Sequence, residues 1–387
     1  MKLAKRLAQS SALVAALGLS LLAPAQAEGA KVGMITTLSG GGAGLGLDTR
    51  DGFLLALKLA GDKAKGIELL IEDDQQKPDV AVQLADKFIQ SDDVDVLTGI
   101  VWSNLAMAVV PAAVQQGKVY LSTNAAPSQL AGGGCNANYF SVSYQNDNLH
   151  EAAGAYANEA GFGKVFIMAP NYPAGVDSLS GFKRFYTGEV ISEVYTQVGQ
   201  TDYAAEIAQI RASGADAAFF FLPGGMGISF IKQYAGAGVD VPVFGPGFSF
   251  SQDVLPAVGE AALGVKNTAN WSKDLDNAAN KAFVEAFRAD YGRLPSLYAA
   301  YAFDTANLLI SALEKADPSQ EEAFRAALKA AEFDSVRGKF SFGPNHHPIQ
   351  DIYVVEVVKE EDGTLTNHIV STVMTDRADA YADQCQM

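Results

Sequence analysis

The sequence predicts an α/β fold with two doubly wound, Rossmann-like lobes and a ligand cleft between them. Strand-like and helix-like segments alternate from residue 31 onward, which is typical of βαβ units. The alternation starts again at residue 149 with a similar plan. The chain has 387 residues, more than one ordinary hydrophobic core can serve, so two domains are expected.

The first series contains four strands separated by helices. Asp48 stands where it could cap the first helix, just after a glycine-rich stretch. Val80, Leu84, Phe88 and Ile89 repeat near the helical period of 3.6 residues. Such a series gives a parallel sheet with helices on both faces. We expect strands at 31–39, 67–73, 94–101 and 119–125, and helices at 48–61, 80–91 and 105–117.

The second series repeats this plan and is followed by a helical region and a hairpin. The hairpin covers 352–371 and turns at Asp362-Gly363. We expect helices at 149–161, 177–188, 203–214 and 226–238, strands at 164–170, 191–196, 216–224 and 242–247, and later helices at 278–292, 297–316 and 319–333.

The N-terminus has the three parts of a secretory signal peptide. Lys2, Lys5 and Arg6 are basic, Leu13–Leu22 is apolar, and Ala25-Gln26-Ala27 is a cleavage motif, so we expect cleavage after Ala27. The apolar part is too short to remain as a membrane anchor, and no later run reaches spanning length. No cysteine stands at the cleavage site for a lipid anchor. The sequence therefore predicts export to the periplasm.

The net charge and the two cysteines indicate which partners to exclude and which covalent bond to expect. The net charge of −16 repels nucleic acid and anionic membranes, so we expect neither as a partner. The two cysteines, Cys135 and Cys385, are expected to form a disulfide in an oxidising compartment. We interpret this pair as a structural bond without redox chemistry.

The glycine-rich stretch Leu38–Phe53 does not match a nucleotide-binding loop. It contains neither G-x-G-x-x-G nor the G-K-[ST] ending of a P-loop. Its glycines would let the backbone approach a ligand closely, and helix amides there could receive an anion. The stretch therefore predicts the wall of a binding cleft.

Catalytic, metal and cofactor sites are not expected. The sequence has no G-x-S-x-G elbow and only four histidines. His346 and His347 have no cysteine or carboxylate beside them to complete a metal site, and His150 is expected to be solvated at a helix opening. We therefore expect a binding protein and no enzyme.

The segments that follow each strand are the candidate cleft wall, because open α/β sheets bind ligands beyond the carboxyl ends of their strands. Trp102 falls directly after a strand, where it could be a cleft aromatic or a core anchor. Arg50 could help to bind a carboxylate, or could face solvent or an ion-pair partner. The other candidates are Ser39, Ser103, Asn104, Ser122, Asn124, Leu45, Tyr172 and Phe248.

Several of these motifs resemble the type I periplasmic binding proteins, the substrate-binding components of ABC importers of the leucine/isoleucine/valine-binding class. The resemblance implies two lobes, three hinge crossings, a monomer and docking of the closed form on ABC permease subunits. It implies lobes at about 28–143 plus 272–345 and 144–271 plus 346–375, with a C-terminal tail at 376–387. The motifs are the signal peptide, KVGMITTLSGGGAGLG, IEDDQQKPDVAVQLADKFIQSDDVDVLTG, PAAVQQGKVYLSTNAAPS and GFKRF.

The resemblance also implies how a ligand carboxylate is held. The family's carboxylate-binding serine falls on Ser103, and its backbone-amide site falls near Asn124 and Ala125. The family's threonine falls on Ala126, and the glutamate that binds the α-ammonium of amino acids falls on Gly247. A buried ammonium without a counter-charge is strongly unfavourable. We therefore expect a carboxylate ligand that lacks an α-amino group.

The chemistry around this carboxylate site favours an aromatic acid. Two further family tyrosines fall on Leu45 and Ala174, and we expect the resulting space at Gly247, Ala126 and Ala174 to fit a flat ring beside Trp102, Tyr172 and Phe248. NYPAG, NHHPIQD and the late cysteine also resemble the family's aromatic-acid-binding branch. We predict a benzoate or a phenylpropanoate.

Three alternatives remain open at this point. The same fold could bind a branched-chain amino acid or an amide, or it could present its ligand to a sensory receptor. An exported enzyme is the third. In each binding alternative, the ligand would bridge the lobes and stabilise the closed form.

Overall fold

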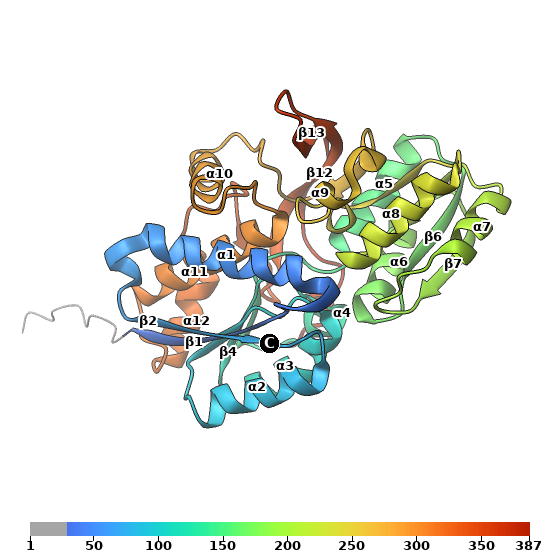
Figure 1. Ribbon diagram of the computed structural model, residues 1–387. Helices are drawn as coiled ribbons and strands as arrows, with labels where there is room; N and C mark the ends of the chain where they lie inside the picture. The colour runs from blue at the N-terminus through green and yellow to red at the C-terminus, as the bar shows by residue number, and fades with distance from the viewer. Residues whose placement is uncertain (1–28) are drawn as a thin grey trace, which may run out of the picture.

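Two separate β-sheets organise the computed structural model, which describes residues 29–387 (Figure 1). The predicted signal peptide lies outside the described residues. The smaller sheet is parallel throughout, with strand order β2-β1-β3-β4-β5. Its strands are β1 Ala30–Thr36, β2 Ile67–Asp73, β3 Val96–Thr98, β4 Val119–Ser122 and β5 Tyr139–Ser141.

Helices from two distant parts of the chain cover this smaller sheet. The long helix α11 packs along α1, although more than two hundred residues separate them, and both run side by side in Figure 1. We call the smaller sheet and these helices lobe 1. The helices are α1 Ala43–Ala60, α2 Pro78–Gln90, α3 Ser103–Gln115, α4 Ser128–Ala131, α10 Ala278–Tyr291, α11 Leu297–Leu313 and α12 Glu321–Ala330.

The larger sheet forms lobe 2, with strand order β11-β12-β10-β9-β8-β6-β7 and β13 paired to β12. Strands β6 to β10 pair in parallel, and β12 runs antiparallel to β10. The strands are β6 Lys164–Pro170, β7 Glu189–Thr196, β8 Ala217–Phe220, β9 Val243–Pro246, β10 Lys266–Ala269, β11 Ser341–Phe342, β12 Pro348–Lys359 and β13 Leu365–Arg377. The helices are α5 Asn148–Glu159, α6 Pro173–Phe185, α7 Ala204–Ala212, α8 Gly225–Ala237 and α9 Leu255–Val258.

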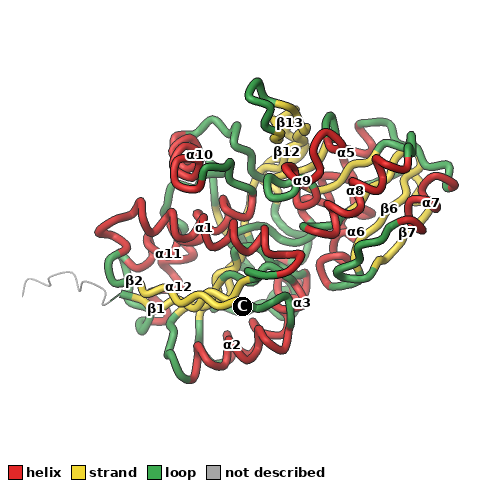
Figure 2. The backbone as a smooth tube through the Cα atoms, viewed as in Figure 1, coloured by secondary structure: helices red, strands yellow, loops and turns green. Residues whose placement is uncertain are grey.

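The central strands are apolar, which explains why they lie buried between layers of helices. β4 and β8 are buried along their whole length, as expected for parallel strands covered by helices on both faces. Figure 2 shows the helices around both sheets. The predicted α/β class with two doubly wound lobes is therefore confirmed, while the predicted residue limits of the lobes stay a prediction. β11, which we expected in the first lobe, pairs with β12 of lobe 2.

The start of α1 differs from the prediction. The helix begins at Ala43, inside the glycine-rich stretch, so Asp48 lies within the helix and is not its N-cap. Asp48 is buried and forms an ion pair with Arg293. A Cβ on Gly46 would collide with the carbonyl oxygen of Thr37, so glycine is what allows this turn to pack on the end of β1.

A buried polar network joins the places where the chain passes between the lobes, at about 142–147, 270–272 and 331–340. Arg337 donates to Asp304 Oδ2 at 3.0 Å and to the Ser143 carbonyl at 2.6 Å. Asn270 donates to the same carbonyl at 3.1 Å and to Gln350 Oε1 at 2.9 Å. These bonds connect all three crossings in one cluster.

The C-terminal tail also runs between the lobes. The Tyr381 hydroxyl donates to Asp147 Oδ2 at 2.8 Å and accepts from Arg184 of lobe 2 at 3.0 Å. Beyond it, Cys385 is bonded to Cys135 of lobe 1, with an S–S distance of 2.09 Å. The predicted disulfide is confirmed, and the tail provides a fourth link between the lobes.

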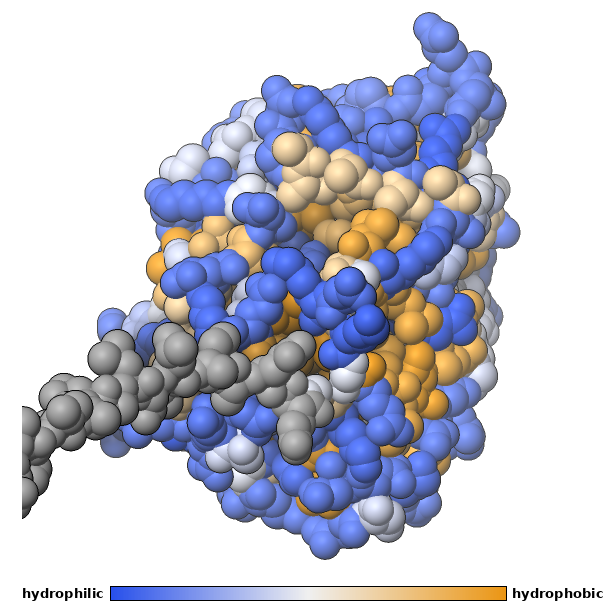
Figure 3. Space-filling view, turned by 90° about the vertical axis from the view of Figure 1, so that its left-hand side faces the viewer, coloured by the Kyte–Doolittle hydropathy of each residue, from blue (hydrophilic) through white to orange (hydrophobic). Residues whose placement is uncertain are grey.

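One face of the molecule can be described by its hydropathy. Most residues on the face shown in Figure 3 are hydrophilic, with apolar patches between them. Within residues 29–387, none of the helices is both long and apolar enough to cross a membrane.

Candidate functional site

A pocket of about 270 Å³ lies between the lobes, beyond the carboxyl ends of several parallel strands. Lobe 1 contributes Leu45, Val101, Trp102, Ser103, Asn124 and Tyr298, lobe 2 contributes Tyr172, Ala174, Phe221, Pro223 and Phe248, and the first crossing contributes Tyr144.

The lobe 1 wall presents hydrogen-bond donors at the start of α3. Ser103 is the first residue of this 13-residue helix, whose first N–H groups have no partner within the helix. The helix dipole makes this end attractive to an anion. Ser103 Oγ accepts from Asn146 Nδ2 at 3.1 Å, which leaves the serine proton free for another acceptor. This end of the pocket can therefore bind a carboxylate.

The Asn124 side chain fixes the neighbouring loop. Its Nδ2 donates to the Val101 carbonyl at 2.7 Å, and its Oδ1 accepts from the Tyr144 hydroxyl at 2.9 Å. Because both ends of the amide have partners, its role here is to hold the backbone in place. The loop after β4 is thus held by hydrogen bonds within the protein.

The lobe 2 wall is made of aromatic rings. Tyr172 and Phe221 stack with centroids 6.3 Å apart, and Phe221 meets Phe248 edge-on at 5.9 Å. Trp102 of lobe 1 faces Tyr172 across the pocket at 6.2 Å, with its indole N–H donated to Thr37 Oγ1 at 3.0 Å. Rings in this arrangement offer flat apolar surface to another ring.

Two tyrosine hydroxyls in the pocket have no hydrogen-bond partner among the described residues, those of Tyr172 and Tyr298. Burial raises the pKa of both, so both stay protonated. Each can therefore donate to, or accept from, a polar substituent on a ligand.

His150 lies directly behind the ring wall, so the expectation of a solvated His150 is wrong. Its ring centroid is 5.0 Å from that of Phe221 and 6.2 Å from that of Phe248. Nδ1 is 3.1 Å from Ser178 Oγ. Burial lowers the pKa of His150 to about 3, so the imidazole is neutral at pH 7 and supports the wall as an aromatic ring.

No charged side chain is among the described residues that line the pocket. Asp253, an acid in the segment after β9, lies against α1, where a Cβ on Gly44 would be 3.4 Å from the Asp253 Cβ. Burial, together with the charge of Asp48, raises the pKa of Asp253 to about 7. The pocket therefore offers no counter-charge for a ligand ammonium.

A family comparison matches this architecture. The family model described as "Periplasmic binding protein" matches residues 29–364. The chain belongs to this periplasmic binding protein family.

Individual relatives of this periplasmic binding protein cover nearly the whole chain. Leu/Ile/Val-binding protein homolog 6 of Brucella melitensis biotype 1 is 30% identical over 364 residues, which is 90% of this chain and 92% of the relative. A solute-binding protein of an ABC transporter from R. palustris, solved with benzoate, is 32% identical with a TM-score of 0.87, covering 93% of this chain and 100% of that one.

A second solved structure carries a related ligand. The solute-binding protein from Rhodopseudomonas palustris BisB5, solved with 3,4-dihydroxybenzoic acid, is 30% identical with a TM-score of 0.83, covering 91% of this chain and 99% of that one. An isoleucine complex of LivJ from Streptococcus pneumoniae is 23% identical with a TM-score of 0.78, and this likeness concerns the fold alone.

The structure brings most of the predicted site residues of this periplasmic binding protein together. Leu45, Trp102, Ser103, Asn124, Tyr172 and Phe248 all line the pocket. Their roles toward a ligand stay predictions.

Ser39 does not line it, and neither does Ser122, whose Oγ donates to the Ala125 carbonyl at 2.6 Å. Four further predicted residues also lie outside it. Arg50 donates to Asp51 Oδ1 from Nε at 3.0 Å and from Nη2 at 2.7 Å. Ala125 is buried, and its N–H donates to the Ile100 carbonyl at 3.4 Å. Asn104 is the second residue of α3, and its buried Oδ1 has no hydrogen-bond partner among the described residues. The fourth is Gly247.

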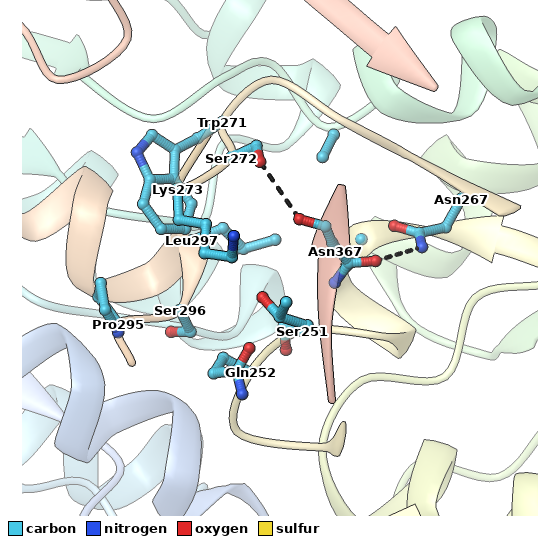
Figure 4. Close-up of a pocket in the computed structure, with 13 residues that line it drawn as sticks. Ser251, Gln252, Asn267, Trp271, Ser272, Lys273, Pro295, Ser296, Leu297 and Asn367 are labelled. Carbon is cyan, nitrogen blue, oxygen red and sulfur yellow. Dashed lines mark hydrogen bonds between the residues drawn. The ribbon is translucent and has the colours of Figure 1, made fainter. Parts of the chain in front are cut away.

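Gly247 lines a different cavity, on the hinge side of the lobes, with about 370 Å³ of empty space (Figure 4). Leu297 and Ala269 occupy the space that a side chain at Gly247 would enter. A Cβ added to Gly247 would lie 3.1 Å from Leu297 and 3.3 Å from Ala269. The expected ligand space at Gly247 is therefore wrong. In Figure 4 this cavity is bordered by amides, including the bond of 2.8 Å from Asn267 to Asn367.

Sequence reasoning missed several lining residues of this periplasmic binding protein. Phe221 and Pro223 follow β8, so the strand-end rule could have found them. Tyr144 lies in a crossing and Tyr298 at the start of α11. No local signal marks these two, because their position depends on how distant helices pack.

Proposed function

We propose that this chain is the substrate-binding component of an ABC importer that captures a small aromatic carboxylate of the benzoate or phenylpropanoate type. The observation that carries the proposal is a ring-lined pocket with a helix N-terminus at one end and no acidic side chain for an ammonium. The benzoate and dihydroxybenzoate complexes of the two R. palustris proteins support it.

In this proposal lobe 1 binds the carboxylate, and rings from both lobes enclose the aromatic end of the ligand. The Ser103 hydroxyl and the first amides of α3 receive the carboxylate. Trp102, Tyr172 and Phe248 enclose the ring. A ligand that touches both lobes stabilises the closed form by its differential affinity for that form.

The remaining parts of the proposal follow from the family and the sequence. The protein acts in the periplasm after cleavage at Ala27, as a monomer, and docks in its closed form on ABC permease subunits. It carries no catalytic residues and no cofactor, and it does not bind nucleic acid. Binding, release and docking are its whole activity.

A thermal-shift panel tests the ligand class. The protein is unfolded and refolded to remove any carried ligand, then heated with leucine, phenylalanine, benzoate, 4-hydroxybenzoate, phenylacetate or coumarate. A ligand that binds only the folded state raises the midpoint. We expect shifts with the aromatic acids and none with leucine. A shift with leucine alone would overturn the aromatic-acid proposal.

A further inference from the structure

The Asp177 carboxylate connects the two lobes outside the ligand pocket. Asp177 lies on α6 of lobe 2, and it is buried. Its Oδ2 accepts from the backbone N–H of Ser128 at 3.0 Å, and its Oδ1 accepts from the Ser128 hydroxyl at 2.6 Å. Ser128 begins α4 of lobe 1. Both bonds therefore exist only while the lobes are together.

Asn146 links this carboxylate to the pocket. Its Nδ2 donates to Asp177 Oδ2 at 2.9 Å and to Ser103 Oγ at 3.1 Å. Its Oδ1 accepts from the Ala126 N–H at 3.1 Å. Asn146 lies in the first crossing, between β5 and α5. One amide group thus touches the interlobe carboxylate, the lobe 1 backbone and the Ser103 hydroxyl.

The orientation of the Ser103 hydroxyl follows from this contact. Its oxygen already accepts a hydrogen from Asn146, so its own proton is free to turn toward the pocket. Asp177 holds Asn146 in the orientation that makes this possible, because its carboxylate is acceptor-only. None of Asp177, Asn146 and Ser128 lines the pocket itself.

We propose that Asp177, Ser128 and Asn146 form a latch that stabilises the closed lobes without touching the ligand and directs the Ser103 proton toward it. Asp177 and Asn146 are positioning residues in this scheme. The direction of the Ser103 proton rests on the proposed function, whereas the interlobe bonds do not depend on any ligand.

The latch has a distinctive signature in binding. A residue that contacts the part in which two ligands differ changes their affinities by different factors. A residue that acts on closure changes the population of the binding-competent form, so it weakens every ligand by the same factor. Asp177→Asn replaces one acceptor oxygen by a donor that faces other donors, which breaks the charge-assisted bonds while keeping the size of the side chain.

Calorimetric titration of Asp177→Asn with benzoate and 4-hydroxybenzoate tests this. We expect both dissociation constants to rise by the same factor, about 10- to 100-fold, the loss of one or two charge-assisted bonds. Ser128→Ala should act in the same direction with a smaller factor, because the backbone bond remains. Both substitutions act on the same contact. The double variant should therefore raise the dissociation constants by less than the product of the two single factors.

Asp216→Asn is the control for the same substitution within one lobe. Asp216 is exposed and accepts two backbone N–H groups, from Gly163 at 2.9 Å and from Lys164 at 2.8 Å, and all three residues belong to lobe 2. We expect it to leave both dissociation constants unchanged. Wild-type affinity in Asp177→Asn, or a changed ratio between the two ligands, would overturn the latch.

Distances between spin labels on the two lobes separate this proposal from the ligand assignment. Without ligand, Asp177→Asn and Ser128→Ala should shift the distance distribution toward the open form, and Asp216→Asn should not. If benzoate failed to bind the wild type, the proposed ligand class would be wrong. The distances measured without ligand would still test the latch. Equal distributions in all four proteins would overturn it.

Discussion

The two walls of the pocket are built in different ways. On lobe 1, polar groups at the start of α3 and after β4 are held by buried hydrogen bonds, such as those of Asn124. On lobe 2, Tyr172, Phe221 and Phe248 hold one another through ring contacts. Under the proposed function, lobe 1 binds the charged end by directed hydrogen bonds, and lobe 2 together with Trp102 binds the apolar ring by shape.

Removing the donor on the polar wall should have the largest effect. Ser103→Ala deletes the hydroxyl that we propose for the carboxylate, and a bond to a charged group contributes about 1.5–3 kcal/mol, or roughly 10- to 100-fold in Kd. Titration with benzoate measures this. Ser311→Ala, a buried serine on α11 away from the pocket, serves as the control. Unchanged affinity in Ser103→Ala would remove this residue from the carboxylate site.

Deleting the ring that faces lobe 2 comes next. Trp102→Ala removes the aromatic surface opposite Tyr172 and should weaken an aromatic acid by roughly 1–3 kcal/mol. Titration with benzoate and with acetate separates the two walls, because acetate has no ring to lose. An equal loss for both acids would mean that Trp102 acts on the carboxylate end.

The pH dependence of stability should report the ring wall through His150. The pKa of His150 is about 3 in the folded protein, against the ordinary value of 6.5 for an unfolded chain. The unfolded chain therefore binds a proton first as the pH falls. The stability that the neutral imidazole supports is present above pH 6.5 and is lost as the pH falls toward 3. His150→Gln should therefore reduce the loss of unfolding free energy between pH 7 and pH 5 by about 1–2 kcal/mol. Urea unfolding at the two pH values measures it, and an unreduced loss would contradict the burial of a neutral imidazole.

Arg50 should give the smallest effect. Its guanidinium pairs with Asp51 and does not line the pocket, so Arg50→Ala should leave the benzoate Kd within about twofold, the range of surface ion-pair effects. A loss of tenfold or more would return Arg50 to the carboxylate site and make the polar wall larger than the structure indicates.

The sequence predicted the fold because alternating strands and helices carry a strong local signal. It predicted Trp102, Ser103 and Tyr172 as pocket residues because the strand-end rule depends only on strand order. It missed the start of α1, since a run of glycines reads as a loop until Gly46 is seen against the Thr37 carbonyl. Tyr298 required the packing of α11 on α1, which is a long-range contact without a local pattern.

The bond between Cys135 and Cys385 imposes an order of events on maturation of the chain. The two sulfurs are separated by 250 residues, and the tail that carries Cys385 reaches lobe 1 only after running past Asp147 and Arg184 of lobe 2. Because Cys385 follows all the strands and helices of both lobes, the bond can form only after both lobes have been synthesised, and it then ties the tail across lobe 2 to lobe 1.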